Sequence, residues 1–202
     1  MGHVDARTPP ARCNAAGGAV SAQRIPRLLV FDLDACLWAP EMFELRGEPR
    51  CWDPEAQGVK TSSGEVVRLF PGAQAAFRRL LKDTSLLGVQ VAVASKTTEA
   101  AYAHRCLDEL EVDGTKLGSL VHYREIAYGS KGRMHFPALR KASGIAYDEM
   151  LFFDDCTYSD NCREVASACP GVVCVRTPDG LSEELFDRGL ARFAEGGVGV
   201  VA

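Results

Sequence analysis

The sequence has no apolar run of the roughly 18 residues that a membrane-spanning helix requires. It has no strong charge of one sign either: 23 Lys and Arg stand against 27 Asp and Glu, and no basic block indicates a nucleic-acid partner. None of its eight cysteines forms a CxxC pair, which excludes a zinc ribbon and a thioredoxin motif. Because no secretory signal core is visible, we expect free thiols, a cytoplasmic location and no membrane or nucleic-acid partner.

Two phosphate-binding loops are absent as well. No cysteine is followed six positions later by arginine, the spacing that a cysteine-dependent phosphatase needs in its phosphate-binding loop. No segment fits the P-loop pattern GxxxxGK followed by Ser or Thr. The GGVGV segment near the C-terminus precedes no helix, so we interpret residues 197–202 as a frayed tail rather than a dinucleotide loop.

The first residues differ in composition from the rest of the chain. Residues 1–24 are rich in Ala, Gly, Pro and Arg and contain one acidic residue, Asp5. We interpret them as a disordered leader, and organelle targeting stays open because transit peptides are also Arg-bearing and acid-poor. Residues 25–196 are long enough for one domain with its own core, since 47% of the whole sequence is hydrophobic.

Short apolar runs alternate with helical patterns from Leu28 onward, which is typical of βαβ units and a parallel sheet. The runs are continuously apolar or nearly so, as expected when helices cover both faces of a sheet. We therefore predict an α/β fold with a doubly wound, mostly parallel five-stranded sheet, a small flap insertion and no large cap domain. The predicted strands are Leu28–Leu33, Val89–Ala94, Ser119–Tyr123, Met150–Phe153 and Val172–Val175. The predicted helices are Ala73–Lys82, Thr98–Leu110, Lys131–Ala142, Asn161–Ala168 and Ser182–Ala194.

The connection over residues 37–69 is much longer than the others and carries three prolines. Long connections beside a site are typically functional or disordered. We interpret this one as a flap with a turn at Lys60–Gly64 and a short strand at Glu65–Leu69. It can pack back on the domain through four apolar side chains: Trp38, Met42, Phe43 and Trp52.

Polar side chains follow the predicted strands where those strands end. Asp32 and Asp34 follow the first strand with i, i+2 spacing, which places both carboxylates on one side of it. In a doubly wound sheet, the residues after successive strands converge on one crevice. The later candidates are Ser95 and Lys96 after the second strand, Lys131 in YGSKGR after the third, and Asp154 and Asp155 after the fourth.

These residue types suit phosphoryl transfer. The carboxylates of Asp32, Asp34 and Asp154 offer the hard oxygen ligands that Mg²⁺ prefers, and the cation would screen an incoming phosphate. One carboxylate can attack phosphorus and form an aspartyl phosphate, while a second carboxylic acid protonates the leaving alkoxide and later activates water. The hydroxyl of Ser95 and the ammonium of Lys131 can hold the phosphate oxygens as charge develops.

The segments FDLDACLW, AVASK, GSK and LFFDD resemble, in this order, the four motifs of the haloacid dehalogenase-like (HAD) phosphohydrolases. Within that superfamily the sequence is most similar to the magnesium-dependent phosphatase 1 group, in which an FDLDxTLW motif follows a short leader. The resemblance extends from about Leu28 to Phe193 and includes the flap-sized insertion. It implies a Mg²⁺-dependent phosphatase whose partner is a phosphorylated small molecule or phosphoprotein.

The resemblance also implies individual roles for the acidic residues. Asp32 matches the nucleophile and a metal ligand, and Asp34 matches the general acid/base, whose backbone carbonyl binds the metal. Asp154 matches the acidic metal ligand of the last motif, and Asp155 supports a metal-bound water. We interpret Asp160 as a helix N-cap rather than as a catalytic group.

The phosphate-binding residues implied by the resemblance are Ser95 and Lys131, and we add Lys96 as a third candidate. Lys96, Arg124 and the flap are candidates for setting substrate preference. The subgroup resemblance suggests aryl phosphates such as phosphotyrosine, with possible protein-tyrosine-phosphatase activity, or sugar phosphates, and the sequence leaves that choice open.

One residue departs from the family pattern, and it leaves a second interpretation open. Cys36 stands where the family usually has Thr, and a thiol is a weaker hydrogen-bond donor than a hydroxyl. A catalytically weak HAD-like binding protein is therefore an alternative, and Cys36 is a candidate for oxidation if its pKa is lowered. A receiver-type signalling module also places acidic residues, Ser/Thr and Lys on a doubly wound sheet, but in the receiver family the lysine comes last.

Overall fold

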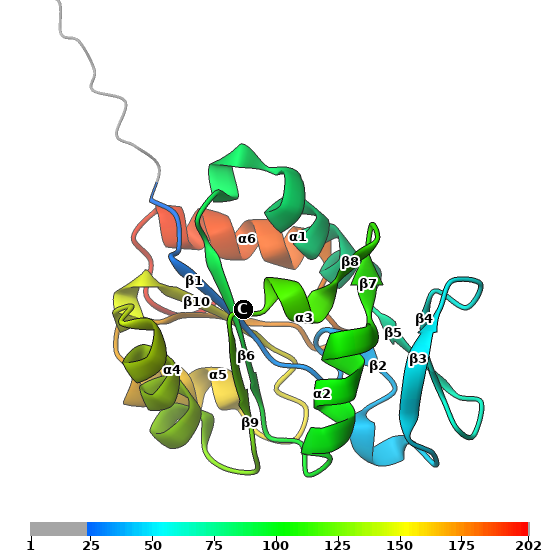
Figure 1. Cartoon of the computed structure of the whole chain (residues 1–202). Coiled ribbons are helices and arrows are strands. Elements are labelled where there is room, and N and C mark those ends of the chain that lie inside the picture. Colours follow the sequence, from blue (N-terminus) through cyan, green and yellow to red (C-terminus); the bar gives the residue numbers. More distant parts are fainter. Residues whose placement is uncertain (1–23, 202) are drawn as a thin grey trace, which may run out of the picture.

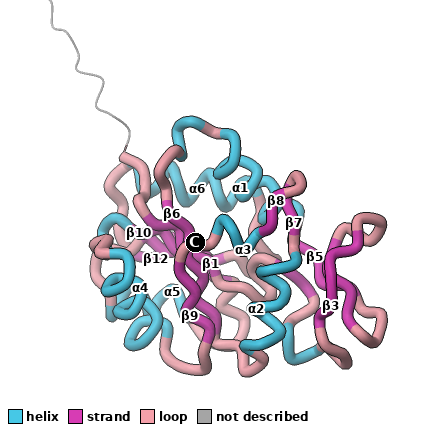
Figure 2. Tube along the Cα trace, in the orientation of Figure 1, coloured by secondary structure: helices cyan, strands magenta, loops and turns pink. Residues whose placement is uncertain are grey.

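The computed structural model describes residues 24–201, so the predicted leader, except for Arg24, lies outside the described residues. Six strands form the main sheet: β1 (Leu28–Phe31), β6 (Gln90–Ser95), β9 (Tyr123–Ile126), β10 (Met150–Asp154), β11 (Val173–Arg176) and β12 (Gly199–Val201). All neighbouring pairs are parallel, in the order β12-β11-β10-β1-β6-β9 (Figure 1, Figure 2). This arrangement confirms the predicted α/β class.

Helices cover both faces of this sheet. They are α1 (Pro71–Lys82), α2 (Ala100–Glu109), α3 (Leu117–Leu120), α4 (Phe136–Ser143), α5 (Asn161–Ala168) and α6 (Glu183–Ala194). Alternate residues of β1 face opposite sides, so Leu29 and Phe31 pack in a core with α1, α2 and α6, whereas Leu28 and Val30 pack in a core with α4 and α5. Figure 1 shows α1 and α6 on one side of the sheet and α4 and α5 on the other. The wholly apolar sequence of β1 follows from this double coverage.

Local signals set where several helices begin. Pro71 stands at the first turn of α1, where its missing N–H costs no helical hydrogen bond. The side chains of Asp160 and Ser182 accept backbone N–H groups at the starts of α5 and α6. The structure therefore confirms the N-cap interpretation of Asp160, and α5 has the predicted bounds.

The predicted strand Ser119–Tyr123 is wrong in position. Residues 117–120 form the short helix α3, and the strand β9 begins only at Tyr123. Strand β9 is at the edge of the sheet and its residues are only half-buried, so it carries Arg124 and Glu125 rather than a continuous apolar run. A search for apolar runs alone therefore predicts the strand in the preceding segment, at residues 119–123, and not at β9.

Two further elements differ from the sequence-based prediction. The sheet has six strands rather than five, because β12 pairs with β11 where we expected a frayed tail; Val200 and Val201 supply the β-branched residues that such pairing favours. The predicted helix Lys131–Ala142 begins as a π-helical segment, Lys131–His135, before α4. Single π turns of this kind occur frequently at functional sites.

The flap is a small antiparallel sheet beside the main domain. Its strands are β2 (Trp38–Ala39), β3 (Pro49–Asp53), β4 (Gly58–Thr61) and β5 (Val66–Leu69). A 3₁₀ turn, Met42–Glu44, lies in the connection between β2 and β3. Trp38 and Met42 are fully buried in the main core, so the base of the flap is anchored to the domain. A separate hairpin connects β7 (Glu111–Val112) to β8 (Thr115–Lys116). Within residues 24–201 no helix is long and apolar enough to cross a bilayer.

Candidate active site

Strands β10, β1 and β6 are neighbours in the sheet, and a polar side chain stands at or just after the carboxyl end of each. Parallel pairing aligns Phe31 of β1 with Phe153 of β10, and β6 lies on the other side of β1. Asp32, Ser95 and Asp154 therefore come together where these strands end, as the sequence predicts. The backbone N–H of Asp32 still donates to the Phe153 carbonyl, 2.9 Å away, which fixes the position of Asp32 against β10.

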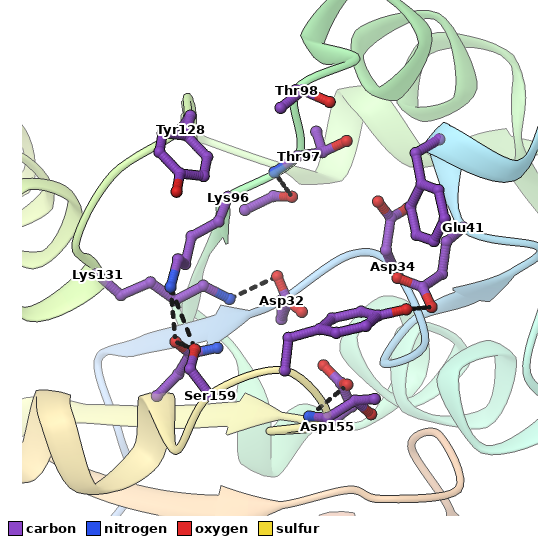
Figure 3. Close-up of a pocket in the computed structure, with 15 residues that line it drawn as sticks. Asp32, Asp34, Glu41, Lys96, Thr97, Thr98, Tyr128, Lys131, Asp155 and Ser159 are labelled. Carbon is purple, nitrogen blue, oxygen red and sulfur yellow. Dashed lines mark hydrogen bonds and ion pairs between the residues drawn. The ribbon is translucent and has the colours of Figure 1, made fainter.

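Lys131 joins the two buried carboxylates. Its Nζ lies 2.6 Å from Oδ1 of Asp32 and 2.5 Å from Oδ2 of Asp154, and its side chain is 1% exposed. Asp154 also accepts from the side-chain amide of Asn161 at 3.0 Å and from the backbone N–H of Cys156 at 2.8 Å. The π-helical start at Lys131 thus delivers an ammonium group to the carboxyl ends of β1 and β10 (Figure 3).

The acidic cluster has the composition of a magnesium site. Carboxylate oxygens of Asp32, Asp154 and Asp155 all lie within 4.8 Å of one another, and all three residues are buried. Three carboxylates against one ammonium group leave an excess of negative charge, which a divalent cation can match, and oxygen is the ligand atom that Mg²⁺ prefers. The donor set therefore fits Mg²⁺. Asp34, also predicted as a ligand, does not contribute its carboxylate to this cluster, which leaves its backbone carbonyl as the group that can reach the metal, and Asp155 adds a third carboxylate.

Burial and mutual charge shift the acidity of these groups. Burial raises the pKa of Asp32 well above its usual range despite Lys131, and the negative charges of Asp154 and Asp155 add to the rise. Burial acts in the same direction on Asp154, but the attraction of Lys131 prevails and lowers its pKa. Burial would lower the pKa of Lys131, yet the two carboxylates raise it above its usual value, so the ammonium form is stabilised.

Asp34 lies near Asp32 in a different environment. Its Oδ1 accepts a hydrogen bond from the indole N–H of Trp38 at 2.7 Å. Burial raises the pKa of Asp34, and the hydrogen bond from Trp38 opposes this rise. Because Trp38 is buried at the base of the flap, it holds the Asp34 carboxyl in one orientation.

A cavity of about 320 Å³ opens above these residues. Lys96 reaches into it and donates to Oγ of Ser159 at 3.2 Å and to Oδ1 of Asn161 at 3.4 Å. Asp154 is fully buried and does not line the cavity, whereas Asp155 does. Figure 3 shows Asp32 between Lys131 and Asp34. The lining residues that the sequence predicted are Asp32, Asp34, Ser95, Lys96, Lys131 and Asp155.

Sequence reasoning missed several residues of this site. Asn161 holds both oxygens of Asp154, at 3.0 and 3.2 Å, although the sequence marks it only as the first residue of a helix. Arg124, a candidate for substrate preference, pairs instead with Asp108, 2.7 Å away, and does not line the cavity. The aromatic residues lining the cavity are Phe43, Tyr128 and Tyr158. Tyr128 is the first residue of the YGSKGR segment after β9, whereas no motif marks Phe43 or Tyr158, because their place depends on how the flap and the loop after β10 fold.

Cys36, the departure from the family pattern, is fully buried and does not line the cavity. Its Sγ lies 3.6 Å from the Phe153 carbonyl and accepts from Oγ1 of Thr177 at 3.3 Å. Burial raises the pKa of the Cys36 thiol well above its usual value, with the charge of Asp32 adding to the rise. Cys36 is a candidate for oxidation only if its pKa is lowered, and the raised pKa does not meet this condition.

Substituting Cys36→Thr is expected to change kcat for p-nitrophenyl phosphate less than about threefold. The side chain at position 36 does not line the cavity and contacts only the Phe153 carbonyl and Thr177. The hydroxyl of threonine is a stronger donor than the thiol, so the substitution strengthens one hydrogen bond outside the cavity. Steady-state kinetics of the two purified proteins at matched Mg²⁺ measure this. An increase of tenfold or more would mean that the cysteine itself weakens the enzyme.

The fold and the site together define the class of this protein. The four motifs predict a HAD phosphatase, and the structure has the features of that class. These are a doubly wound α/β domain with a small flap, a lysine between two buried aspartates, and an acidic cluster that fits Mg²⁺.

Comparisons with known proteins agree with this assignment. Residues 24–196 match the family model of the acid phosphatases, and the chain belongs to this family of HAD phosphatases. Magnesium-dependent phosphatase 1 of Homo sapiens is 34% identical over 176 residues, which cover 87% of this chain and 92% of the human protein. The receiver-type interpretation is thereby excluded.

A solved structure adds support for the fold. It is the N-terminal part of a Bacteroides fragilis protein containing a phosphatase domain, in complex with Mg, with a TM-score of 0.53 and 18% identity. The match covers 86% of this chain and 40% of that one, so this chain spans less than half of the solved structure. The family match and the human relative place the chain among the phosphatases of the HAD class, and its buried acidic cluster fits Mg²⁺.

Proposed function

We propose that the protein hydrolyses phosphate monoesters in two steps through a phosphorylated Asp32. The observation that carries this proposal is the position of the Asp32 carboxylate. It lies 2.6 Å from the ammonium of Lys131, lines the open cavity and belongs to the cluster that fits Mg²⁺. It is therefore the member of the cluster that meets both a cation and an incoming substrate.

In the first step, an oxygen of Asp32 attacks phosphorus and the ester bond to the leaving group breaks. Asp34 lines the same cavity and has a raised pKa, so it suits the acid that protonates the departing alkoxide. In the second step, the carboxylate of Asp34 accepts a proton from a water molecule. The water oxygen attacks phosphorus, the bond from phosphorus to Asp32 breaks, and inorganic phosphate and free Asp32 are released. Trp38 keeps the Asp34 carboxyl oriented in both steps.

Positive charge and a hydroxyl act on the phosphate oxygens. Lys131 is the cation closest to Asp32, and Ser95 ends β6 beside it in the lining of the cavity. Lys96 adds a second ammonium in the cavity. When bound, Mg²⁺ supplies electrophilic stabilisation of the phosphoryl group and neutralises the acidic cluster. Asp32 and Asp154 are the proposed direct protein ligands, with the backbone carbonyl of Asp34, and Asp155 supports a water of that site.

The proposed substrates are aryl phosphates, including phosphotyrosine, or sugar phosphates. The cavity is lined in part by the flap and is large enough, at about 320 Å³, for a small phosphate ester. Among residues 24–201 no large cap domain closes over it. A phosphorylated side chain on a protein surface and a free metabolite both fit such an opening.

The proposal predicts that phosphate-ester hydrolysis disappears when Mg²⁺ is removed. We expect excess EDTA to lower the rate on p-nitrophenyl phosphate at least about a hundredfold, because the acidic cluster then repels the substrate, and added Mg²⁺ to restore it. The assay is repeated with phosphotyrosine and with a sugar phosphate as substrates. A rate that EDTA leaves unchanged, or the absence of turnover on every phosphate monoester with Mg²⁺ present, would reject the proposal.

A further inference from the structure

Large apolar side chains are exposed at the mouth of the cavity. Phe43 is 58% exposed, Tyr158 73% and Tyr128 77%, and all three line the cavity. Single exposed apolar residues need no explanation, but a group of them around one opening marks a binding surface. Figure 3 shows Tyr128 and Glu41 on opposite sides of Asp32, so the opening has two walls with the acidic centre between them.

The wall formed by Phe43 and Tyr158 is held together across two distant parts of the chain. Phe43 belongs to the 3₁₀ turn of the flap, and Tyr158 belongs to the loop after β10. Their rings meet edge to face with centroids 6.3 Å apart, and the Tyr158 hydroxyl donates to Oε1 of Glu41 at 3.0 Å. These contacts fix the relative position of the two rings before any ligand arrives.

The loop that carries Tyr158 is also tied to the acidic centre. The backbone N–H of Thr157 donates to Oδ2 of Asp155 at 2.9 Å, and Oγ of Ser159 is bonded to Lys96. The ring of Tyr158 therefore has a defined height above the site where phosphorus would react. Since Phe43, Tyr128 and Tyr158 line the same cavity as Asp32, a group attached to that phosphorus lies among these rings.

We propose that Phe43 and Tyr158 form the leaving-group subsite, and that this subsite favours a planar, uncharged aromatic leaving group over a small aliphatic one. The inference rests on the proposed function. Ring faces and edges stack well on another ring, whereas a small aliphatic group covers less of them and gains less from the contact. The carboxylate of Glu41 on this wall, already bonded to Tyr158, also disfavours an anionic leaving group.

The test compares two substrates that share the phosphate and differ in the ring: phenyl phosphate and glycerol 2-phosphate. We expect Phe43→Ala and Tyr158→Ala each to lower kcat/KM for phenyl phosphate about fivefold, and the double variant to lower it at least about tenfold. The value for glycerol 2-phosphate is expected to change less than about twofold. Tyr158→Phe, which keeps the ring and loses the hydroxyl, should lose less than Tyr158→Ala.

A binding measurement separates recognition from chemistry. Phenylphosphonate and methylphosphonate cannot be hydrolysed in the same way, and their Kd values for the Mg²⁺-loaded protein are measured by calorimetry. The wild type is expected to prefer phenylphosphonate, and the double variant to lose most of that preference. Leu87→Ala, which removes an exposed apolar side chain that does not line the cavity, serves as the matched control and should keep the preference.

Two results would overturn the subsite assignment. One is an aryl preference that stays within about twofold in the double variant, and the other is an equal loss for both substrates, which indicates a structural role for the rings. Failure of the proposed function has a different signature. In that case the wild type itself shows no Mg²⁺-dependent turnover of either ester, whatever the two aromatic residues are.

Discussion

Substituting Asp32→Asn is expected to lower kcat for p-nitrophenyl phosphate at least about a thousandfold. An amide is not a nucleophile toward phosphorus at neutral pH, and the substitution removes both the attacking oxygen and one charge of the acidic cluster. The Asn side chain keeps the shape of Asp and can still contact Lys131, so the fold is expected to persist. Circular dichroism and thermal unfolding of the variant check this.

The matched control for this substitution is Asp160→Asn. Asp160 is an acidic residue at the start of α5, near the site but not lining the cavity, and asparagine retains the oxygen that caps the helix. We expect its kcat to stay within about twofold of wild type. Asp32→Asn that retains more than about a tenth of the wild-type kcat would reject Asp32 as the nucleophile.

The second large effect is expected for Lys131→Met. Lys131 is buried between two carboxylates, and methionine fills a similar volume without the charge. Removing one partner of a buried ionic group leaves the others uncompensated, so we expect the free energy of unfolding without Mg²⁺ to fall by about 3–5 kcal/mol. Turnover is expected to fall at least about a hundredfold, because the phosphate oxygens lose a cation.

Urea unfolding with and without Mg²⁺ measures the stability of this variant. Added Mg²⁺ should return part of the lost stability, since a divalent cation bound to the folded state compensates the same carboxylates. Lys141→Met, at an exposed position of α4, is the control and should change stability by less than about 0.5 kcal/mol. A variant of Lys131 as stable as the wild type in EDTA would contradict the charge balance described for this site.

The residues at the strand ends are predictable from the sequence because their signal is local. β1 and β10 are apolar along their length until the aspartates, and parallel strands end at a common edge, so Asp32 and Asp154 have to meet. The edge strand β9 lacks such a signal, because no strand of the described residues 24–201 pairs with one of its sides and its own residues stay half-buried. The apolar pattern therefore predicts this strand several residues too early.

Other features depend on long-range folding, which periodicity cannot reveal. Tyr158 and Glu41 are 117 positions apart, and their hydrogen bond exists only because the flap and the loop after β10 fold toward each other. Asn161 reaches Asp154 because α5 starts directly below the site. The grouping of Asp155, rather than Asp34, with the other two carboxylates is set by the turn after β10, where the N–H of Thr157 holds its carboxylate.

The central claim is that Asp32 carries the phosphoryl group during turnover, and trapping the protein in that state tests it most directly. The protein is quenched while it turns over phenyl phosphate, and the quenched protein is reduced with borohydride. Borohydride reduces an acyl phosphate to an alcohol, so an aspartyl phosphate becomes homoserine. Peptide mass spectrometry is predicted to find homoserine at position 32, dependent on both substrate and Mg²⁺. Homoserine at another aspartate, or none at position 32 while turnover continues, would contradict the account.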